Sequence, residues 1–346
     1  MKKEYIIPIF VPHLGCPNNC IFCNQKRISG QTKMVNADDV KNTIDYYLKH
    51  FKDDNKYVEV AFFGGSFTAI EVSKQVELLE VVQEYIKNKK VNSIRISTRP
   101  DCIDKEILKR MKKYHVKTIE LGVQSTNNYI LSRCKRGHTG EVVKKASKLI
   151  RMHGFILGHQ MMIGLPESTK QDEINTAKEL IKQKPKLVRI YPVLVIKDTE
   201  LADEYERGEY IPLTVSQAVE RCKEIVDLFN RHKINVIRIG LQNTEEITDP
   251  NDKSSSVIAG PYHPAFRQLV EASMWYDAIV NKIKKVNAKV KKVKIIANDV
   301  NINNIIGHKK ENILKLKEIY DVDIVIEKNN DVKPGKFKME ILESYE

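Results

Sequence analysis

Residues 12–24 read Pro-His-Leu-Gly-Cys-Pro-Asn-Asn-Cys-Ile-Phe-Cys-Asn, which places cysteines at positions 16, 20 and 23. The spacing C-x3-C-x2-C puts three thiols on one loop, and three thiolates can hold three irons of a 4Fe–4S cubane. The fourth iron then stays open to a small-molecule ligand, whereas a four-cysteine site mainly transfers electrons. We therefore predict that Cys16, Cys20 and Cys23 bind an open 4Fe–4S cluster.

Two other kinds of cysteine site were weighed against this prediction. A structural zinc site usually brings a second ligand pair some fifteen residues further on. The nearest later candidates here are His50 and Cys102, which do not form such a pair. A thioredoxin-like redox pair would not need Cys16. The spacing therefore favours the iron–sulfur interpretation.

Length and composition set the broad class of the protein. The chain has 346 residues, which is enough for one large α/β domain and a small one. It has no run of 18 apolar residues, and residues 1–5 carry no signal-peptide apolar region, so we predict neither a membrane span nor a leader. Six cysteines are too few for a disulfide scaffold, so we expect the reducing cytoplasm.

The charge of the chain favours a polyanionic partner. The formal net charge is +13, although a lysine-rich genome composition would also explain part of it. Residues 282–294 hold seven lysines and no acidic residue, whereas a solvated helix face normally mixes charges of both signs. We predict phosphate contact by this run, and name Lys291, Lys292 and Lys294 as RNA-binding residues.

Short apolar runs alternate with amphipathic stretches over the first 240 residues. This alternation predicts an α/β fold with parallel strands and crossover helices, and six repeats indicate an open, partial (β/α)6 barrel. The expected strands are 6–12, 58–64, 93–98, 118–124, 156–164 and 187–196. The expected helices are 37–51, 73–88, 104–114, 140–153 and 170–182.

Polar and glycine-rich segments follow the expected strands. In βα barrels the chemistry lies on the loops at the carboxyl ends of the strands. The cysteine loop follows the first strand, and residues 62–68 with Gly64-Gly65 follow the second. Residues 97–101, 122–125 and 159–166 follow or end the next three. We expect all of these segments to meet at one rim.

Several of these segments resemble a known family. The cysteine loop is similar to that of the radical S-adenosylmethionine (radical SAM) enzymes. Residues 98–101 (Thr-Arg-Pro-Asp), 122–125 (Gly-Val-Gln-Ser), 136–139 (Arg-Gly-His-Thr) and 190–199 resemble the radical SAM half of the catalytic subunit of Elongator, which modifies the wobble uridine of tRNA. The resemblance extends from about residue 5 to about residue 245.

The chain departs from that family in two ways. Its cysteines are more closely spaced than those of the Elongator subunit. That subunit continues into an acetyltransferase domain that handles acetyl-CoA, whereas this chain ends about 100 residues after the expected barrel. We therefore do not expect the acetyl-CoA reaction here.

The resemblance implies roles for individual side chains. Cys16, Cys20 and Cys23 would hold the cluster, whose open iron binds the methionine amino and carboxylate groups of SAM. The implied SAM-binding or substrate-binding residues are Phe22 near the adenine, Gly64, Gly65 and Ser66 near the amino group, and Arg99, Gln124, Ser125 and Gln160 near the ribose, carboxylate or substrate. Tyr191 and Lys197 would lie on the substrate side as catalytic residues.

The last 60 residues resemble a different family. After residues 1–242 of the barrel and a linker and helix at 243–285, residues 286–346 are expected to form strand 291–297, helix 309–320 and strand 322–327. Gly307, His308, Lys309 and Lys310 resemble the backbone-clamping loop of a KH RNA-binding domain. Lys310 replaces the second glycine, which loses a close backbone approach and adds a cation. The alternative is a small α/β cap that packs on the barrel.

The sequence thus predicts a cytoplasmic radical SAM enzyme that modifies RNA, with a tRNA uridine as the first guess and rRNA as a second target. Its cofactors would be the 4Fe–4S cluster and S-adenosylmethionine, and its electron donor a protein such as flavodoxin or ferredoxin. Two alternatives stay open. One is a radical SAM enzyme with a small-molecule substrate, as in coproporphyrinogen-oxidase-like relatives. The other is a non-catalytic RNA-binding protein with a structural cluster.

Overall fold

The computed structural model describes residues 3–11, 16, 19–24, 27–28, 34–53, 55–242, 244, 246–286 and 289–345. Its described residues form two compact units. The first unit comprises residues 1–218 and 225–262, and the second comprises residues 219–224 and 263–346. None of the described helices is long and apolar enough to cross a membrane.

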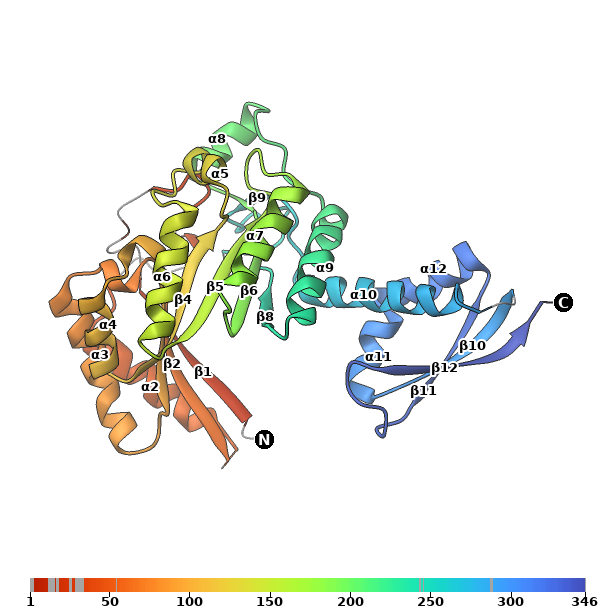
Figure 1. Ribbon diagram of the computed structural model, residues 1–346, viewed down its shortest axis with the longest axis horizontal. Coiled ribbons are helices and arrows are strands. Elements are labelled where there is room, and N and C mark those ends of the chain that lie inside the picture. The colour runs from red at the N-terminus through yellow and green to blue at the C-terminus, as the bar shows by residue number, and fades with distance from the viewer. Residues whose placement is uncertain are drawn as a thin grey trace. The chain divides into compact units, whose positions relative to one another are not determined.

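A curled parallel sheet forms the centre of the first unit (Figure 1). Its seven strands follow the order β1-β2-β3-β4-β5-β6-β8, and every neighbouring pair is parallel. The strands are β1 (Lys3–Phe10), β2 (Lys56–Phe63), β3 (Ser93–Thr98), β4 (Val116–Gln124), β5 (Ile156–Ile163), β6 (Leu187–Pro192) and β8 (Asn235–Ile239). The expected partial barrel is confirmed, and β8 adds a strand beyond the six that were expected.

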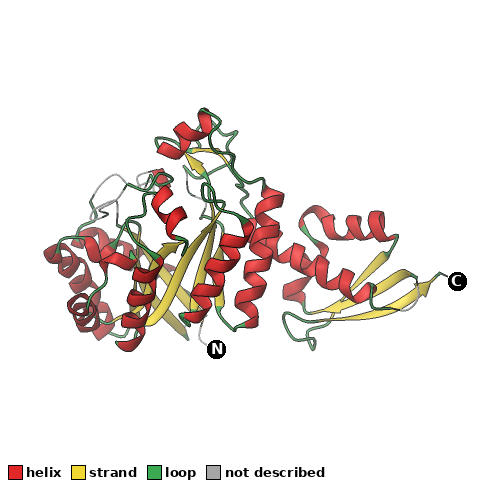
Figure 2. Cartoon of the chain, turned by 45° about the horizontal axis from the view of Figure 1, so that its top comes forward, coloured by secondary structure: helices red, strands yellow, loops and turns green. Residues whose placement is uncertain are grey.

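Helices cover the outer side of this sheet (Figure 2). The helices are α2 (Ala37–His50), α3 (Val72–Lys87), α4 (Lys105–Lys113), α5 (Asn128–Arg133), α6 (Gly140–Met152), α7 (Lys170–Lys182), α8 (Glu200–Glu206) and α9 (Val215–Arg231). Of these, α5 and α8 lie above the ends of the strands in Figure 1 and not on the face of the sheet. Side-chain caps define several starts, because the first amides of a helix lack partners within it. Thr169 and Asp172, for example, form a capping box at α7, and Thr139 caps α6.

Burial on both faces explains why most of the strands read as near-continuous apolar runs. All six residues of β3 are buried, and Ile94 and Ile96 are completely so. The polar members of these strands, such as Arg95 on β3 and Glu120 on β4, are also buried. Because an unpaired buried charge is costly, these side chains must find partners inside the sheet, and they do so at the site described below.

A two-stranded antiparallel ribbon lies outside the main sheet in the first unit. It pairs β7 (Val195–Ile196) with β9 (Val257–Ala259). Val195 belongs to a hydrophobic cluster that includes Ile21 and Phe22 of the cysteine loop. The ribbon therefore helps to hold that loop in place.

The second unit has a three-stranded sheet with helices packed on one face. Strand β10 (Val290–Ala297) lies between β11 (Asp323–Lys328), which is parallel to it, and β12 (Phe337–Ser344), which is antiparallel. The helices are α10 (Phe266–Ile283), α11 (Asp299–Ile306) and α12 (Glu311–Tyr320). Val293 and Ile295 of the sheet form one core with Ile279 of α10, Ile305 of α11 and Leu316 of α12. Helix α11 and strand β12 were not among the expected elements.

Candidate functional site

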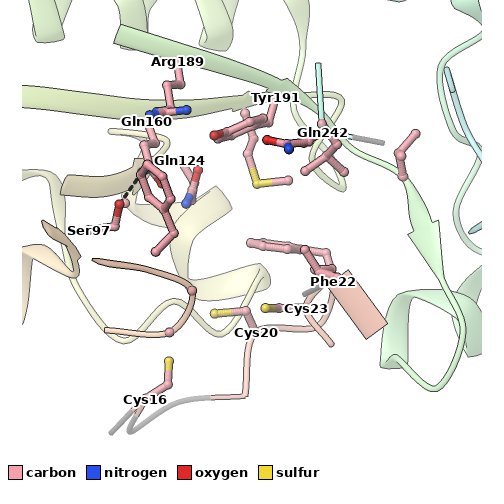
Figure 3. A pocket seen from close by; sticks show the side chains of 18 of the residues that line it. Cys16, Cys20, Phe22, Cys23, Ser97, Gln124, Gln160, Arg189, Tyr191 and Gln242 are labelled. Atoms are coloured by element: carbon pink, nitrogen blue, oxygen red, sulfur yellow. Dashed lines mark hydrogen bonds between the residues drawn. The ribbon is translucent and has the colours of Figure 1, made fainter. Parts of the chain in front are cut away.

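A cavity of about 250 Å³ opens among the carboxyl ends of the strands of the first unit (Figure 3). Side chains from widely separated parts of the chain line it. Most of the predicted barrel-site residues are among them: Cys16, Cys20, Phe22, Cys23, Gly64, Gly65, Arg99, Gln124, Gln160 and Tyr191. The structure therefore brings the three cysteines and the polar rim residues to one site.

The described part of the cysteine loop is anchored through Ile21. The Ile21 amide donates to the carbonyl of Cys134 at 3.4 Å, and the Leu201 amide donates to the carbonyl of Ile21 at 2.8 Å. The Ile21 side chain is 1% exposed and lies in the cluster that also contains Cys20 and Phe22. These contacts fix the backbone of Ile21, which lies between Cys20 and Cys23. The cysteine side chains are not needed for this anchoring and line the cavity.

Two arginines lie on the cysteine side of the cavity. Arg136 donates from Nη1 to Cys20 Sγ at 3.1 Å, and Arg99 donates to both carboxylate oxygens of Asp101, at 3.0 and 2.8 Å. Burial opposes the charge of Arg99, but Asp101 together with Cys16 and Cys20 outweighs it and raises the pKa of Arg99. The guanidinium group of Arg99 is therefore cationic beside the thiols.

Buried polar atoms without partners show that this side of the cavity suits a polar ligand. Among the described residues, Arg99 Nη1, Arg136 Nε and Gln124 Oε1 are buried and make no hydrogen bond. Such atoms are rare in folded proteins because each costs the full desolvation of the group. Two unpartnered donors and one unpartnered acceptor lie beside three thiols. This set fits a cluster with a bound zwitterionic ligand such as an amino acid, whose carboxylate needs donors and whose amino group needs an acceptor.

The three thiols do not converge on one point. No group of three His, Cys, Asp or Glu side chains in the described ranges is placed to hold a single metal ion. A cubane does not need such convergence, because each thiolate binds a different iron. The separation of Cys16 from Cys20 and Cys23 in Figure 3 is thus compatible with a cluster.

Gly64 allows close approach at the end of β2. Its φ is +90°, and a Cβ at this position would lie 2.5 Å from the carbonyl oxygen of Val11. Glycine adopts this backbone conformation without the steric cost that other residues pay. The Gly64-Gly65 turn can therefore pass directly beside the end of β1 and present its backbone to the cavity.

Three of the predicted residues, Ser66, Ser125 and Lys197, do not line this cavity. The Ser66 hydroxyl bonds to Thr98 Oγ1 at 2.8 Å and accepts from the Arg99 amide at 3.3 Å. The Ser125 hydroxyl accepts from the Asn127 amide at 3.1 Å. The Lys197 carbonyl accepts from Asn24 Nδ2 at 3.3 Å, just past the cysteines. In this structure all three brace neighbouring segments.

A buried charge network supports the wall opposite the cysteines. Glu120 of β4 is 0% exposed and accepts from Arg95 Nη1 at 2.7 Å and from Arg189 Nε at 2.6 Å and Nη2 at 3.0 Å. Gln160 Nε2 donates to the same carboxylate at 3.1 Å. Burial acts to raise the pKa of Glu120, but the two arginines outweigh it and hold this pKa below its usual value.

Sequence reasoning missed several lining residues, above all Arg189, Arg238 and Gln242. Arg189 could have been found. Alternate residues of a strand point to the same face, and Tyr191, two positions further on, was already predicted to face the substrate. Arg238 lies on β8, the strand that was not expected, so no pattern pointed to it.

The second unit contains the predicted RNA-binding loop between α11 and α12. Gly307 has a φ of +83°, and a Cβ there would lie 2.9 Å from the Asn312 amide nitrogen. Asn312 Nδ2 donates to the carbonyls of Asn304 and Ile305 at 3.2 and 3.1 Å, which fixes the turn. Lys309 and Lys310 have φ values of +49° and +64°, so two lysines occupy conformations that favour glycine.

The predicted RNA-binding lysines of β10 lie beside carboxylates. Lys292 and Lys291 are 3.5 and 3.8 Å from Glu343, and Lys294 is 3.2 Å from Glu327 on β11 and 3.5 Å from Glu340 on β12. The lysine run has no acidic residue of its own, but strand pairing supplies acidic neighbours. This sheet surface therefore carries charges of both signs.

Comparison with known proteins identifies two family regions. The model of the radical SAM superfamily matches residues 10–180, and that of the radical SAM C-terminal domain matches residues 185–276. Together they span the cavity described above.

Three relatives illustrate the similarity. A tRNA uridine(34) acetyltransferase of Methanocaldococcus infernus is 35% identical over 185 residues, which cover 47% of this chain and 34% of that protein. An uncharacterised protein of Methanocaldococcus jannaschii is 31% identical over 228 residues, which cover 63% of this chain and 70% of that protein. The solved structure of archaeal Elp3 from M. infernus, with an N-terminal deletion, has a TM-score of 0.61 at 22% identity and covers 82% of this chain and 64% of that one. The chain thus spans about a third of the acetyltransferase that it matches.

Proposed function

The chain belongs to the radical SAM superfamily, and we propose that it is an enzyme that cleaves S-adenosylmethionine reductively in order to modify a nucleotide of RNA, with a tRNA uridine as the first candidate. The superfamily uses a 4Fe–4S cluster and SAM. When bound at Cys16, Cys20 and Cys23, the cluster would provide the electron needed to cleave SAM into methionine and a 5′-deoxyadenosyl radical. The residues of this chain bind, orient and shield these groups.

The observation that carries the enzyme part of the proposal is the shared cavity. Cys16, Cys20 and Cys23 would hold the cluster, and the unpartnered donors of Arg99 and Arg136 would bind the carboxylate of SAM. The Gly64-Gly65 turn would offer backbone groups to its amino group. These positions are fixed before any ligand binds, because Ile21, Asp101 and Gly64 are held by the contacts described above.

Apolar side chains would keep water from the reacting centre. Phe10, Phe63, Met162, Leu194 and Leu241 line the same cavity. A reactive radical abstracts hydrogen from many groups, so exclusion of solvent and of misplaced substrate is part of the protein's task.

The RNA part of the proposal is supported by the loop of the second unit and by the similarity to a tRNA uridine(34) acetyltransferase. Gly307 to Lys310 would clamp the nucleic-acid backbone, with Lys309 and Lys310 supplying positive charge. The site lies in a chain with a net charge of +13. An external one-electron donor such as flavodoxin or ferredoxin, and a cytoplasmic location, complete the proposal.

The test is anaerobic turnover of the reconstituted full-length protein. With dithionite and SAM, we expect 5′-deoxyadenosine formation that increases when small RNA is added. Alanine at Cys16, Cys20 or Cys23 should abolish the cluster absorbance and the product, whereas Cys222→Ala, a cysteine in α9, should retain both. Cleavage that RNA does not affect would favour a small-molecule substrate, and a stable cluster without any cleavage would favour a binding-only protein.

A further inference from the structure

We propose that Arg189, Tyr191 and Arg238 form an anion-binding site on the cavity wall opposite the cysteines, which takes a phosphate or carboxylate group of the substrate. The inference rests on the proposed function in one respect, because it treats this cavity as the place where substrate and SAM meet. It assigns a ligand chemistry to Tyr191, which the family resemblance places on the substrate side, and to two arginines that the sequence patterns did not single out.

The charge of the lining is the first argument. Four arginines line the cavity, namely Arg99, Arg136, Arg189 and Arg238, and no aspartate or glutamate is among the described lining residues. Glu120, which binds Arg189, is not itself a lining residue. A ligand inside the cavity therefore meets guanidinium groups from more than one side, which favours an anion.

The pairing of two arginines is the second argument. In the register of the parallel strands β6 and β8, Arg189 lies directly beside Arg238, and both side chains line the cavity. Two guanidinium groups on neighbouring strands can therefore reach one anionic group of a ligand, which guanidinium donors bind in bidentate fashion.

Arg189 is oriented to donate into the cavity. It is 8% exposed, and Glu120 fixes its guanidinium group through Nε and Nη2. A guanidinium group has five N–H donors, so the two bonds to Glu120 and the bond to the Tyr191 hydroxyl leave two for other partners. Its plane also lies over the ring of Phe63, with Cζ 5.0 Å from the ring centroid. Little side-chain entropy is then lost when a ligand binds.

Tyr191 adds a neutral donor to the same wall. Burial raises the pKa of its hydroxyl, and although Arg189 acts to lower it the net direction is upward. The phenol therefore stays protonated at neutral pH and can donate its O–H to an anionic oxygen. Figure 3 shows Tyr191, Arg189 and Gln160 on one side of the cavity and Cys20 and Cys23 on the other.

The location separates this site from the arginines beside the cysteines. The cysteine loop follows β1 at one edge of the seven-stranded sheet, whereas Arg189 and Arg238 lie on β6 and β8 at the other edge. Arg136 is bonded to Cys20 itself. The wall formed by β6 and β8 is thus available to the substrate while the other side holds the cofactors.

Binding of small anions to the full-length protein tests the proposal. The protein, with its cluster reconstituted and SAM added, would be titrated calorimetrically under anaerobic conditions with uridine 5′-monophosphate, inorganic phosphate, malonate and uridine. We expect at least one anion to bind and uridine to bind more weakly. The Kd of the anion should rise about tenfold in Arg238→Gln and in the double variant Glu120→Gln/Arg189→Gln. It should rise by less than tenfold in Tyr191→Phe. Lys145→Gln, an exposed change on α6, should leave it unchanged.

The double variant removes both members of a buried ion pair, so that no uncompensated charge remains. If it fails to fold, Arg238→Gln and Tyr191→Phe still decide the matter. Tightest binding of uridine 5′-monophosphate would identify a nucleotide phosphate as the source, and tightest binding of malonate would identify a small carboxylate co-substrate. Anion affinity that is equal in the wild type and Arg238→Gln, or no anion binding at all, would overturn the proposal.

The same samples separate this inference from the proposed function. Absence of RNA-dependent 5′-deoxyadenosine together with anion binding that Arg238→Gln weakens would remove the RNA substrate and keep the anion site. RNA-dependent product together with anion binding that no variant affects would keep the RNA substrate and remove the anion site.

Discussion

Arg136 donates a hydrogen bond from Nη1 to the sulfur of Cys20 at 3.1 Å, although 116 positions separate the two residues in the chain. Both are buried, and Arg136 Nη2 also donates to the carbonyl of Gly122. The guanidinium group thus joins the cysteine loop to the end of β4. If Cys20 holds the cluster as proposed, this cation is positioned to affect the electron affinity of the cluster.

Removal of this donor should make the cluster harder to reduce. Hydrogen bonds to cluster sulfurs stabilise the more electron-rich state and raise the reduction potential. We expect Arg136→Met to lower it, and a loss of about 1.4 kcal/mol of differential stabilisation corresponds to about 59 mV for one electron. Anaerobic redox titration followed by electron paramagnetic resonance measures the change. The matched change Arg151→Met on α6 should leave the potential in place, and an equal shift in both would contradict the interpretation.

Glu120 should be far more important for stability than an exposed acid. Glu120→Gln would leave Arg95 and Arg189 buried without their shared carboxylate, and breaking a buried ion pair from one side costs about 3–5 kcal/mol. Urea denaturation of the cluster-free protein gives the free energy of unfolding. Glu106→Gln, which breaks an exposed pair with Lys109, should cost about 0.5 kcal/mol or less. Similar losses in the two variants would show that the network does not hold the sheet together.

His159 should make the first unit sensitive to acid. It is 0% exposed, its Nε2 contacts Ser147 Oγ at 2.9 Å, and burial lowers its pKa from 6.5 to about 3. Between these values the unfolded state binds the proton and the folded state does not, so stability falls as the pH drops below 6.5. At pH 5 the loss from this residue is about 2 kcal/mol relative to neutral pH.

The variant His159→Gln checks this expectation, because a glutamine amide can replace the contact of Nε2 without titrating. The stability of the wild type relative to this variant should decrease between pH 7 and pH 5 in urea denaturation of the cluster-free protein. His138, whose pKa burial lowers to about 4, titrates in both proteins and cancels in the difference. A difference that does not change with pH would mean that His159 is protonated in the folded state.

Lys310 and Lys292 should differ in RNA binding. Lys310→Gly relieves a positive φ and should stabilise the second unit by about 0.5–1 kcal/mol. If Lys310 contacts a phosphate, Lys310→Gly should also make the negative slope of log K against log salt for RNA binding shallower by about 1. Lys292→Gln, which removes a lysine that lies beside Glu343, should change this slope less. Filter binding at several salt concentrations measures both slopes, and equal changes would show that the two lysines contribute alike.

Local spacing determined the parts of the protein that the sequence could predict. Three cysteines within eight residues predict a cluster loop without reference to the tertiary structure, because their separation along one loop limits what they can bind. The βα alternation specified parallel strands, and parallel strands bring their following loops to one edge. The placement of Gln124 and Gln160 in the cavity followed from that rule.

The tertiary structure alone decided which distant residues face one another. The Arg189–Arg238 pair depends on the register of β6 against β8, and the Lys292–Glu343 pair on the register of β10 against β12. A one-residue change of register moves every side chain of a strand to the other face, and no local pattern fixes that choice. The sequence by itself thus determined the cluster loop and the class of fold. Strand pairing determined where the charges of this protein meet, because Coulomb interactions depend on distance in space and not along the chain.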